Sequence, residues 1–231
     1  MTEKVQRLRV TFARGDELKY ITHLDLMRTW ERALRRAEIP VAYSEGFSPH
    51  PQMSLAAPLP VGTTSEGELL DVWLSRPMTP RAFLAQVAPS LPRGLEARAA
   101  QEVGMGLPAL QADVRWADYE VDVAADEEEA RAAAERFLAQ ESIPWEHKRE
   151  EEVRKYDIRA QVQDVSVLRA DGHLVTLRMR LKNDNTGSGR PEQVVAALGL
   201  GAPLRIHRTR LVLAGGSPSR EAWRKRGRFA S

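Results

Sequence analysis

The chain has 231 residues, 42% of them hydrophobic and 29% charged, a composition typical of a folded globular protein. It contains no cysteine, which excludes disulfide bonds, thiol nucleophiles and cysteine-ligated zinc or iron–sulfur sites. The five histidines are dispersed, and no apolar run approaches the roughly 20 residues of a membrane span. We therefore expect a cytoplasmic protein with no metal site, no cofactor and no membrane contact.

Charge is distributed unevenly along the chain. The formal net charge is +2, but residues 205–231 hold eight basic residues against one acidic residue, a net charge of +7. The rest of the chain therefore carries −5. A basic tail on an acidic body indicates an anionic partner, which could be RNA, DNA or an acidic protein, and a solubilising tail is the alternative.

The first half of the chain predicts the element order β-α-β-β-α-β. Residues 6–15 alternate in the manner of a strand, and residues 22–39 follow helix periodicity with Thr22 as N-cap and Pro40 after the end. The remaining elements are strands at 52–59 and 67–75, a helix at 79–91 and a strand at 94–103.

The second half repeats this order after a glycine- and proline-containing segment. We expect a strand at 117–124, a helix at 126–140, two strands within 155–182 around the turn Asp171-Gly172, a helix at 190–200 and a strand at 204–214. The fold class is therefore α+β, two tandem ferredoxin-like domains with a basic C-terminal tail. The boundaries are 1–103 for domain 1, 104–113 for the linker, 114–214 for domain 2 and 215–231 for the tail.

The main candidate site combines cationic, aromatic and imidazole side chains around the first helix. Its members are Lys19, Tyr20, His23, Arg28, Arg32, Arg35, Arg36, Tyr43, Phe47 and His50. Cations bind phosphates and rings stack on unpaired bases, which together suit single-stranded nucleic acid. The alternative is a solvated arginine face, with Tyr43 and Phe47 in the core.

Three further segments carry candidate binding residues. Arg190 follows a Gly/Ser/Asn loop at a helix start, which is either an anion site or an ordinary loop. Lys155, Asp157 and Arg159 would share one side of a strand, as phosphate-binding groups or as a self-paired exposed row. In the tail, Arg224, Lys225 and Arg226 lie between Trp223 and Phe229, and basic residues interspersed with aromatic ones suit an RNA-contacting arm.

Several motifs resemble a known family. "HLDLMR" at 23–28, "ERALRRA" at 31–37, "YSEGFSPHP" at 43–51 and "SEGELLDV" at 65–72 are similar to the radical SAM-linked (radical SAM-associated) proteins, whose function is uncharacterised. "KYDIR" and "GRPEQVV" extend the likeness loosely into the second half. The resemblance implies a separate radical SAM protein as partner, because this chain lacks the cysteine motif of the radical enzyme itself.

These observations leave three functions open. The favoured one is a non-catalytic accessory protein that binds RNA, for instance tRNA, and presents it to the radical SAM partner. The second is a metal-independent endoribonuclease, by analogy of fold, with Tyr20, His23 and Lys19 as candidate catalytic residues. The third is a docking subunit that binds protein but no RNA.

Overall fold

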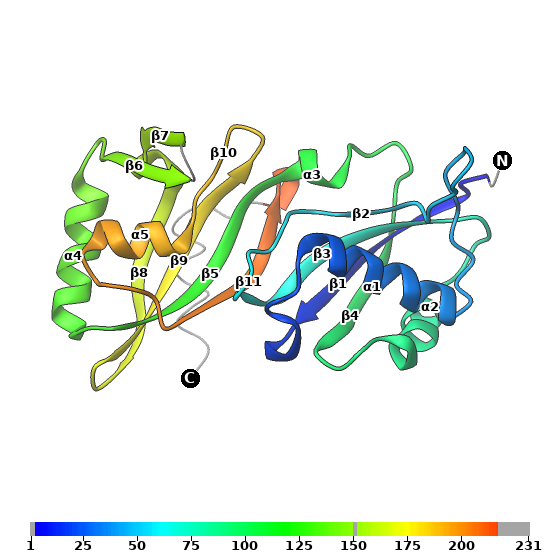
Figure 1. Ribbon diagram of the computed structural model, residues 1–231, viewed down its shortest axis with the longest axis horizontal. Helices are drawn as coiled ribbons and strands as arrows, with labels where there is room; N and C mark the ends of the chain where they lie inside the picture. The colour runs from blue at the N-terminus through cyan, green and yellow to red at the C-terminus, as the bar shows by residue number, and fades with distance from the viewer. Residues whose placement is uncertain (1–2, 150–151, 217–231) are drawn as a thin grey trace. The chain divides into compact units, whose positions relative to one another are not determined.

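The computed structural model describes residues 3–149 and 152–216 and divides the chain into two compact units, Met1–Val114 and Arg115–Ser231. Both combine helices with antiparallel strands, so the protein is a mixed α+β fold (Figure 1). Among the described residues, no helix has both the length and the apolar composition needed to cross a membrane.

Unit 1 contains four strands and two longer helices in the predicted order. Its elements are β1 (Gln6–Arg14), η1 (Asp16–Leu18), α1 (His23–Arg36), β2 (Met53–Leu55), β3 (Thr64–Leu74), α2 (Pro80–Val87), η2 (Ala88–Ser90), β4 (Leu95–Val103) and α3 (Leu110–Asp113). Pairing gives the strand order β4-β1-β3-β2, with every pair antiparallel. The predicted strand at 52–59 shortens to three residues, while the other elements lie where periodicity placed them.

Alternation along β1 separates the core of unit 1 from a polar layer. Leu8, Val10 and Phe12 are fully buried together with apolar residues of α1, β3 and α2. Phe12 packs edge-on against Trp30 of α1, with ring centroids 5.2 Å apart. Apolar burial against both helices thus fixes α1 on the sheet and turns its polar side outward.

The opposite face of the same sheet buries an ion-pair cluster. Asp71 on β3 accepts hydrogen bonds from Arg7 and Arg9 on β1, with each arginine Nε 2.8 Å from a carboxylate oxygen. Arg7 is 1% exposed and Asp71 is 0% exposed. Arg7 also donates to the carbonyls of Leu107 and Pro108, so the segment predicted as a linker lies against unit 1.

Unit 2 has the same order of elements with additional strands. Its elements are β5 (Val114–Ala124), α4 (Glu127–Ala139), β6 (Pro144–Arg149), β7 (Glu152–Asp157), η3 (Arg159–Gln161), β8 (Val162–Asp171), β9 (Leu174–Asp184), β10 (Gly187–Ser188), α5 (Pro191–Leu198), β11 (Arg205–Leu213) and η4 (Ala214–Gly216). The main strands follow the order β8-β9-β5-β11, and β10 also pairs with β9. The β8–β9 turn is Gly172-His173, one residue later than expected.

A polar pairing similar to that of unit 1 recurs in the sheet of unit 2. Asp118 on β5 accepts from Arg180 of β9 at 2.6 Å and from Arg210 of β11 at 2.8 Å. Both Asp118 and Arg180 are buried. The helices of unit 2 also contribute buried apolar side chains, such as Phe137 of α4 and Val194 of α5.

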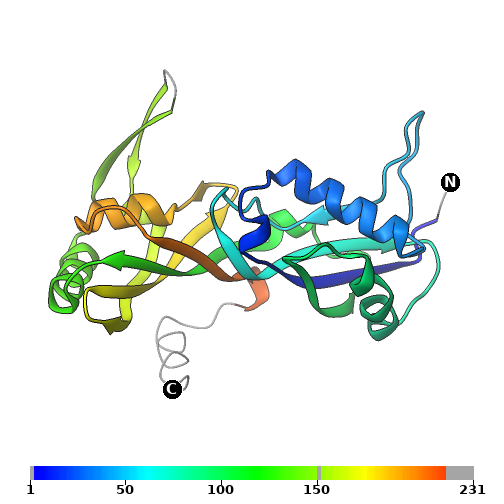
Figure 2. The same cartoon turned by 60° about the horizontal axis from the view of Figure 1, so that its bottom comes forward.

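Strands β6 and β7 form a separate two-stranded hairpin, called the arm below. The arm projects from the rest of unit 2 (Figure 2). No strand was predicted at 144–149, and the next predicted strand began at residue 155, inside β7. The arm consists mainly of charged and polar residues, so its sequence lacks the apolar alternation by which strands are recognised.

Candidate functional site

Helix α1 presents a continuous row of arginines to solvent. Its apolar side, with Leu26 and Trp30, is buried. The arginines Arg28, Arg32, Arg35 and Arg36 are all exposed. Their spacing of four, three and one residues keeps them on one side of the helix, which we call the arginine face. The prediction that these side chains are exposed is therefore confirmed.

A local hydrogen-bond motif fixes the start of this helix. The hydroxyl of Thr22 accepts from the backbone N–H of Asp25, and the Asp25 carboxylate accepts from the Thr22 backbone in return. This capping box satisfies donors that the first helical turn leaves unpaired. The hydrogen bond from the Thr22 hydroxyl lowers the pKa of Asp25 below its usual value of 3.8.

The segment 43–51 forms a projecting loop with a closed base, called the aromatic hairpin. Tyr43 and Pro51 form a β-bridge, and the Ser44 N–H donates to the His50 carbonyl at 2.9 Å. The His50 N–H donates in turn to the Ser44 hydroxyl at 2.9 Å. Phe47 is 109% exposed, His50 is exposed and Tyr43 is half-buried. The alternative that Phe47 belongs to the core is wrong.

The arginine face and the aromatic hairpin meet at one end of α1. The hairpin projects beyond the C-terminal end of the helix (Figure 2). Arg32, Arg35 and Arg36 occupy the last two turns, at the end of the helix from which the chain leads into the hairpin. Cationic and aromatic side chains from two segments thus lie at the same end of unit 1.

Lys19, Tyr20 and His23 lie at the opposite end of α1. A helix of 14 residues is about 20 Å long, so this group is separated from the hairpin by that length. The sequence treated both groups as one cluster, whereas the structure divides them between the two ends of the helix.

The lysine of this group is already paired. Lys19 Nζ lies 3.0 Å from the Asp16 carboxylate and 5.4 Å from the centre of the Tyr20 ring, and Tyr20 is 72% exposed. The hydrogen bond and charge of Asp16 raise the pKa of Lys19 above 10.5. The carboxylate of Asp16 thus stabilises the charged form of Lys19.

Each member of the predicted row Lys155, Asp157 and Arg159 has a hydrogen-bond or ion-pair partner within unit 2. Lys155 pairs with Glu146 across the arm at 2.7 Å. Asp157 accepts from the backbone N–H groups of Ile143 and Arg159, both at 2.9 Å, and the first of these bonds is the main reason for its lowered pKa. Strand β7 ends at Asp157, so alternation does not extend to Arg159.

Arg159 instead stabilises the backbone of unit 2. Its guanidinium donates to the carbonyls of Val162 and Leu138 at 2.7 and 3.3 Å. The ion pair of Lys155 fits the alternative of a self-paired exposed row, whereas Arg159 lies beyond the end of the strand, so the three residues do not form one row.

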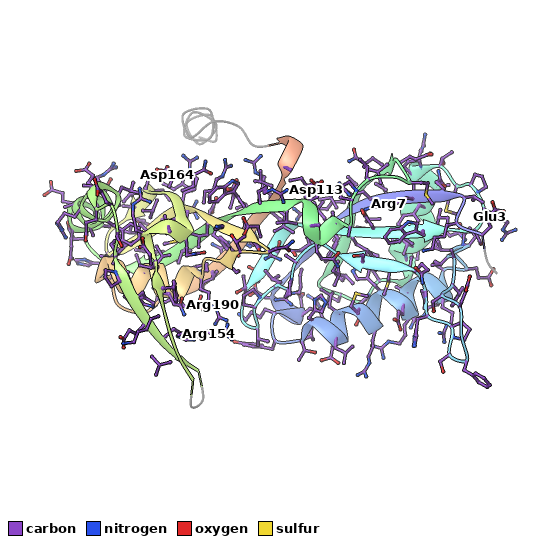
Figure 3. The ribbon with its side chains drawn as sticks, turned by 90° about the horizontal axis from the view of Figure 1, so that it is seen from above. Glu3, Arg7, Asp113, Arg154, Asp164 and Arg190 are labelled. Atoms are coloured by element: carbon purple, nitrogen blue, oxygen red, sulfur yellow. The ribbon has the colours of Figure 1, made fainter. Side chains whose placement is uncertain are left out.

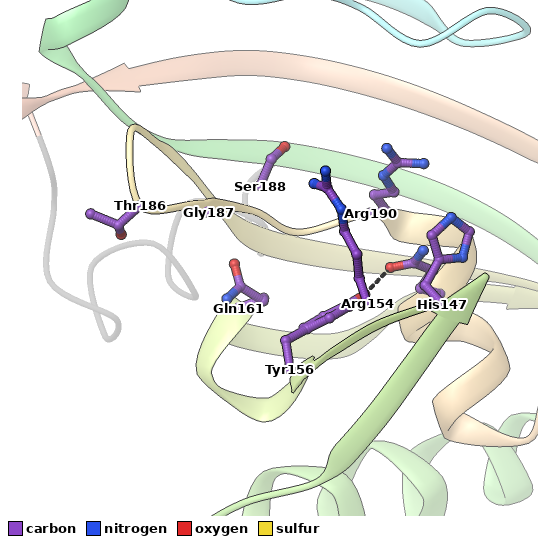
Figure 4. A pocket seen from close by; sticks show the side chains of 9 residues that line it. His147, Arg154, Tyr156, Gln161, Thr186, Gly187, Ser188 and Arg190 are labelled. Carbon is purple, nitrogen blue, oxygen red and sulfur yellow. Dashed lines mark hydrogen bonds between the residues drawn. The ribbon is translucent and has the colours of Figure 1, made fainter. Parts of the chain in front are cut away.

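The opposite face of β7 lines a cavity of about 310 Å³ in unit 2. Arg154 and Tyr156 reach it from β7, His147 from β6, and Arg190 from the residue before α5 (Figure 4). His147 and Arg154 are register partners across the arm and therefore share one face. Of these four residues only Arg190 was predicted; alternation in β7 was the available signal for Arg154 and Tyr156.

The remaining predicted cations, Arg224, Lys225 and Arg226, lie outside the described residues. Within residues 3–149 and 152–216, no three acidic or imidazole side chains gather closely enough to hold a metal ion.

Comparison with known proteins places the chain among uncharacterised relatives. A family model described as "Uncharacterized protein conserved in bacteria (DUF2344)" matches residues 7–191. No curated protein matches the chain.

Three solved structures align with most of the chain at TM-scores below 0.5. A chain of a Cbf5-Nop10-Gar1 complex has a TM-score of 0.47 and 13% identity over 90% of this chain. A chain of the archaeal box H/ACA sRNP Nop10-Cbf5 complex has a TM-score of 0.43 and 15% identity over 90%. A chain of an H/ACA RNP bound to a substrate RNA containing 2′-deoxyuridine has a TM-score of 0.43 and 14% identity over 91%. The protein spans 48 to 49% of each of these chains.

Proposed function

We propose that this chain, which belongs to the family of uncharacterised bacterial proteins matched over residues 7–191, is an accessory protein that binds single-stranded RNA. The arginine face and the aromatic hairpin of unit 1 form the binding surface. The observation that carries the proposal is the exposure of Phe47 on a hairpin held by its own hydrogen bonds.

Phe47 has no structural role that would explain its presence. Single exposed apolar residues are common on protein surfaces, but most keep part of their side chain against a neighbour. A side chain that is 109% exposed buries nothing and contributes nothing to folding by the hydrophobic effect. A ring held in water on a rigid base is suited to stacking on a base, because little entropy is lost on binding.

The neighbouring charges favour RNA over an apolar partner. Arg32, Arg35 and Arg36 are exposed at the end of α1 that adjoins the hairpin. Guanidinium groups bind the phosphates on either side of a stacked base, and together they provide both interactions that single strands need.

We also infer that each unit is a ferredoxin-like fold, and that the two units form a tandem pair. The strand orders β4-β1-β3-β2 and β11-β5-β9-β8 support this inference. Both orders place the first and third strands of a β-α-β-β-α-β series at the centre of the sheet.

A separate radical SAM protein is the proposed partner. The motifs "HLDLMR" and "YSEGFSPHP" support it through their resemblance to the radical SAM-linked proteins. The structure places both motifs on unit 1, in α1 and the aromatic hairpin. Co-purification of a radical SAM protein with the tagged chain, before and after RNase treatment, tests whether the partnership is direct.

RNA binding is tested by fluorescence anisotropy with short unstructured RNAs over a range of salt concentrations. Phe47→Ala should weaken binding by about 1–3 kcal/mol, the usual value of one stacked base. The triple variant Arg28→Ala, Arg32→Ala, Arg35→Ala should lower the slope of log K against log salt by about 2. The control, Arg131→Ala, Arg136→Ala, Arg169→Ala, removes the same charge from exposed positions of unit 2.

Equal losses in the two triple variants would mean that net charge alone drives binding. The wild type could instead fail to bind RNA but still capture a radical SAM protein after RNase treatment. If Phe47→Ala then abolished that capture, the surface would be a protein-docking site.

A further inference from the structure

The cavity of unit 2 lies between the arm and the β9–α5 connection. Arg154 and Tyr156 line it from the arm, Gly187 and Ser188 from β10, and Gln193 from α5. Figure 3 shows Arg154 and Arg190 on the same side of unit 2. At about 310 Å³ the cavity reaches the lower limit of the volumes that enclose small organic ligands, and it is larger than an inorganic anion requires.

Its lining favours an anion. Two guanidinium groups and one imidazole reach it, from Arg154, Arg190 and His147, and none of its nine lining residues has a carboxylate. Three carboxylates are adjacent in sequence to lining residues. Glu146 pairs with Lys155, and Asp157 accepts from the backbone N–H groups of Ile143 and Arg159. The third, Glu192, adds to the effect of burial in raising the pKa of Tyr156, which the charge of Arg190 offsets. Arginine pairs are the usual ligands of phosphate groups, which they bind with two parallel hydrogen bonds.

Neutral hydrogen-bonding groups occupy the other end of the cavity. Figure 4 shows His147, Arg154 and Arg190 gathered at one end, and Gln161 and Thr186 at the other. Gln161 Oε1 is buried without a hydrogen-bond partner in the structure. A buried acceptor left unpaired costs free energy, so a ligand with a donor at this position would relieve that cost.

Tyr156 adds an aromatic side chain between the two ends. Its hydroxyl donates to Gln193 Oε1, which leaves the Gln193 amide nitrogen as a donor. Burial raises the pKa of Tyr156 above 10, so the phenol stays neutral and does not repel an anion. The cavity thus combines cations at one end with an aromatic ring and amide groups toward the other.

We propose that this cavity binds a nucleoside monophosphate, either free or as the 5′-terminal residue of an RNA strand. The phosphate lies between Arg154 and Arg190, within reach of His147. The base lies toward Gln161, whose unpaired oxygen accepts from an exocyclic amino group. Binding of a free nucleotide would be an activity separate from the proposed RNA binding. Binding of an RNA end would instead depend on the proposed function being correct.

Binding is tested by calorimetry on the full chain with the four nucleoside 5′-monophosphates, the matching nucleosides and inorganic phosphate. At least one monophosphate should bind on the order of tenfold or more tightly than both its nucleoside and phosphate alone. Arg154→Gln and Arg190→Gln should each weaken it on the order of tenfold. Lys155→Gln is the matched control, because Lys155 neighbours Arg154 but faces Glu146 on the other side of the arm.

A second variant obstructs the cavity without removing charge. A Cβ at Gly187 would lie 2.5 Å from Gln161 Oε1, so Gly187→Ala must displace the Gln161 amide. We expect Gly187→Ala to weaken nucleotide binding while the chain remains folded by circular dichroism. Phosphate binding as tight as nucleotide binding, or nucleotide binding unchanged in both arginine variants, would overturn the proposal.

The two sources of the ligand are distinguished with an RNA octamer that carries either a 5′-phosphate or a 5′-hydroxyl. The measurements use Phe47→Ala, which should weaken RNA binding at the proposed surface of unit 1 and leave mononucleotide binding to the cavity unchanged. A preference for the 5′-phosphate that Arg190→Gln abolishes identifies an RNA end, and mononucleotide binding without that preference identifies the free nucleotide. Absence of both overturns the proposal, whatever the outcome for RNA binding at unit 1.

Discussion

The Tyr156 hydroxyl donates a hydrogen bond to the side-chain oxygen of Gln193, and this bond joins β7 of the arm to helix α5. Gln193 is buried, whereas the arm is a two-stranded hairpin that projects from its unit. An isolated hairpin of two strands is only marginally stable in water. This hydrogen bond therefore helps to hold the arm, and with it one wall of the cavity, against α5.

We expect Tyr156→Phe to lower the free energy of unfolding by about 0.5–1.5 kcal/mol, because it removes the bond and leaves Gln193 Oε1 unpaired. Urea denaturation followed by circular dichroism measures the change. Gln193→Ala should lower the free energy of unfolding by less in the Tyr156→Phe variant than in the wild type. Additive effects would contradict the coupling between these two side chains.

The same tyrosine should titrate late. Burial raises its pKa above the ordinary value of 10, so the folded state binds this proton more tightly than the unfolded state. Its contribution to stability is complete below pH 10 and is lost as pH rises through the higher folded value. Ultraviolet titration of the four tyrosines should show a late component that Tyr156→Phe removes.

Asp71→Ala should be among the most destabilising single substitutions in unit 1. It would leave the buried guanidinium groups of Arg7 and Arg9 without their carboxylate, a change that typically costs about 3–5 kcal/mol. Chemical denaturation measures this loss. The control Asp16→Ala breaks an exposed pair with Lys19 and should cost about 1 kcal/mol or less. Similar losses in the two variants would show that the Asp71 cluster has little effect.

Thr22→Ala should destabilise α1 by about 1 kcal/mol, because the first turn loses its cap. Thermal denaturation compares it with Thr29→Ala, which removes a hydroxyl that donates to the Asp25 carbonyl within the same helix and caps nothing. Equal effects would contradict a specific capping role for Thr22.

The cap should also weaken in acid. Because the pKa of Asp25 is lowered in the folded chain, its contribution is present above pH 3.8 and is lost as pH falls through the folded value. The difference in stability between the wild type and Thr22→Ala should therefore shrink below that pH.

Local sequence predicted those features of the fold that depend only on residues close together in the chain. The Thr22 N-cap and the exposed arginines of α1 were predicted from residue type and spacing alone. Prediction was incomplete at β7, where it gave Lys155 and Asp157 as binding groups and overlooked Arg154 on the other face. Alternation separates the two faces of a strand but does not tell which face has partners.

The sequence by itself determined the order of the main strands and helices of each unit, without β6, β10 and α3. It also determined the amphipathic α1 and the absence of cysteine, because periodicity, capping and composition act within a few residues. Only the tertiary structure decided that Lys19 and Phe47 lie at opposite ends of α1. It also brought Arg154 and Arg190 to one cavity, although 36 residues separate them in the chain. Contacts of that kind depend on how the arm, β10 and α5 pack together, and packing between distant segments leaves no periodic trace in sequence.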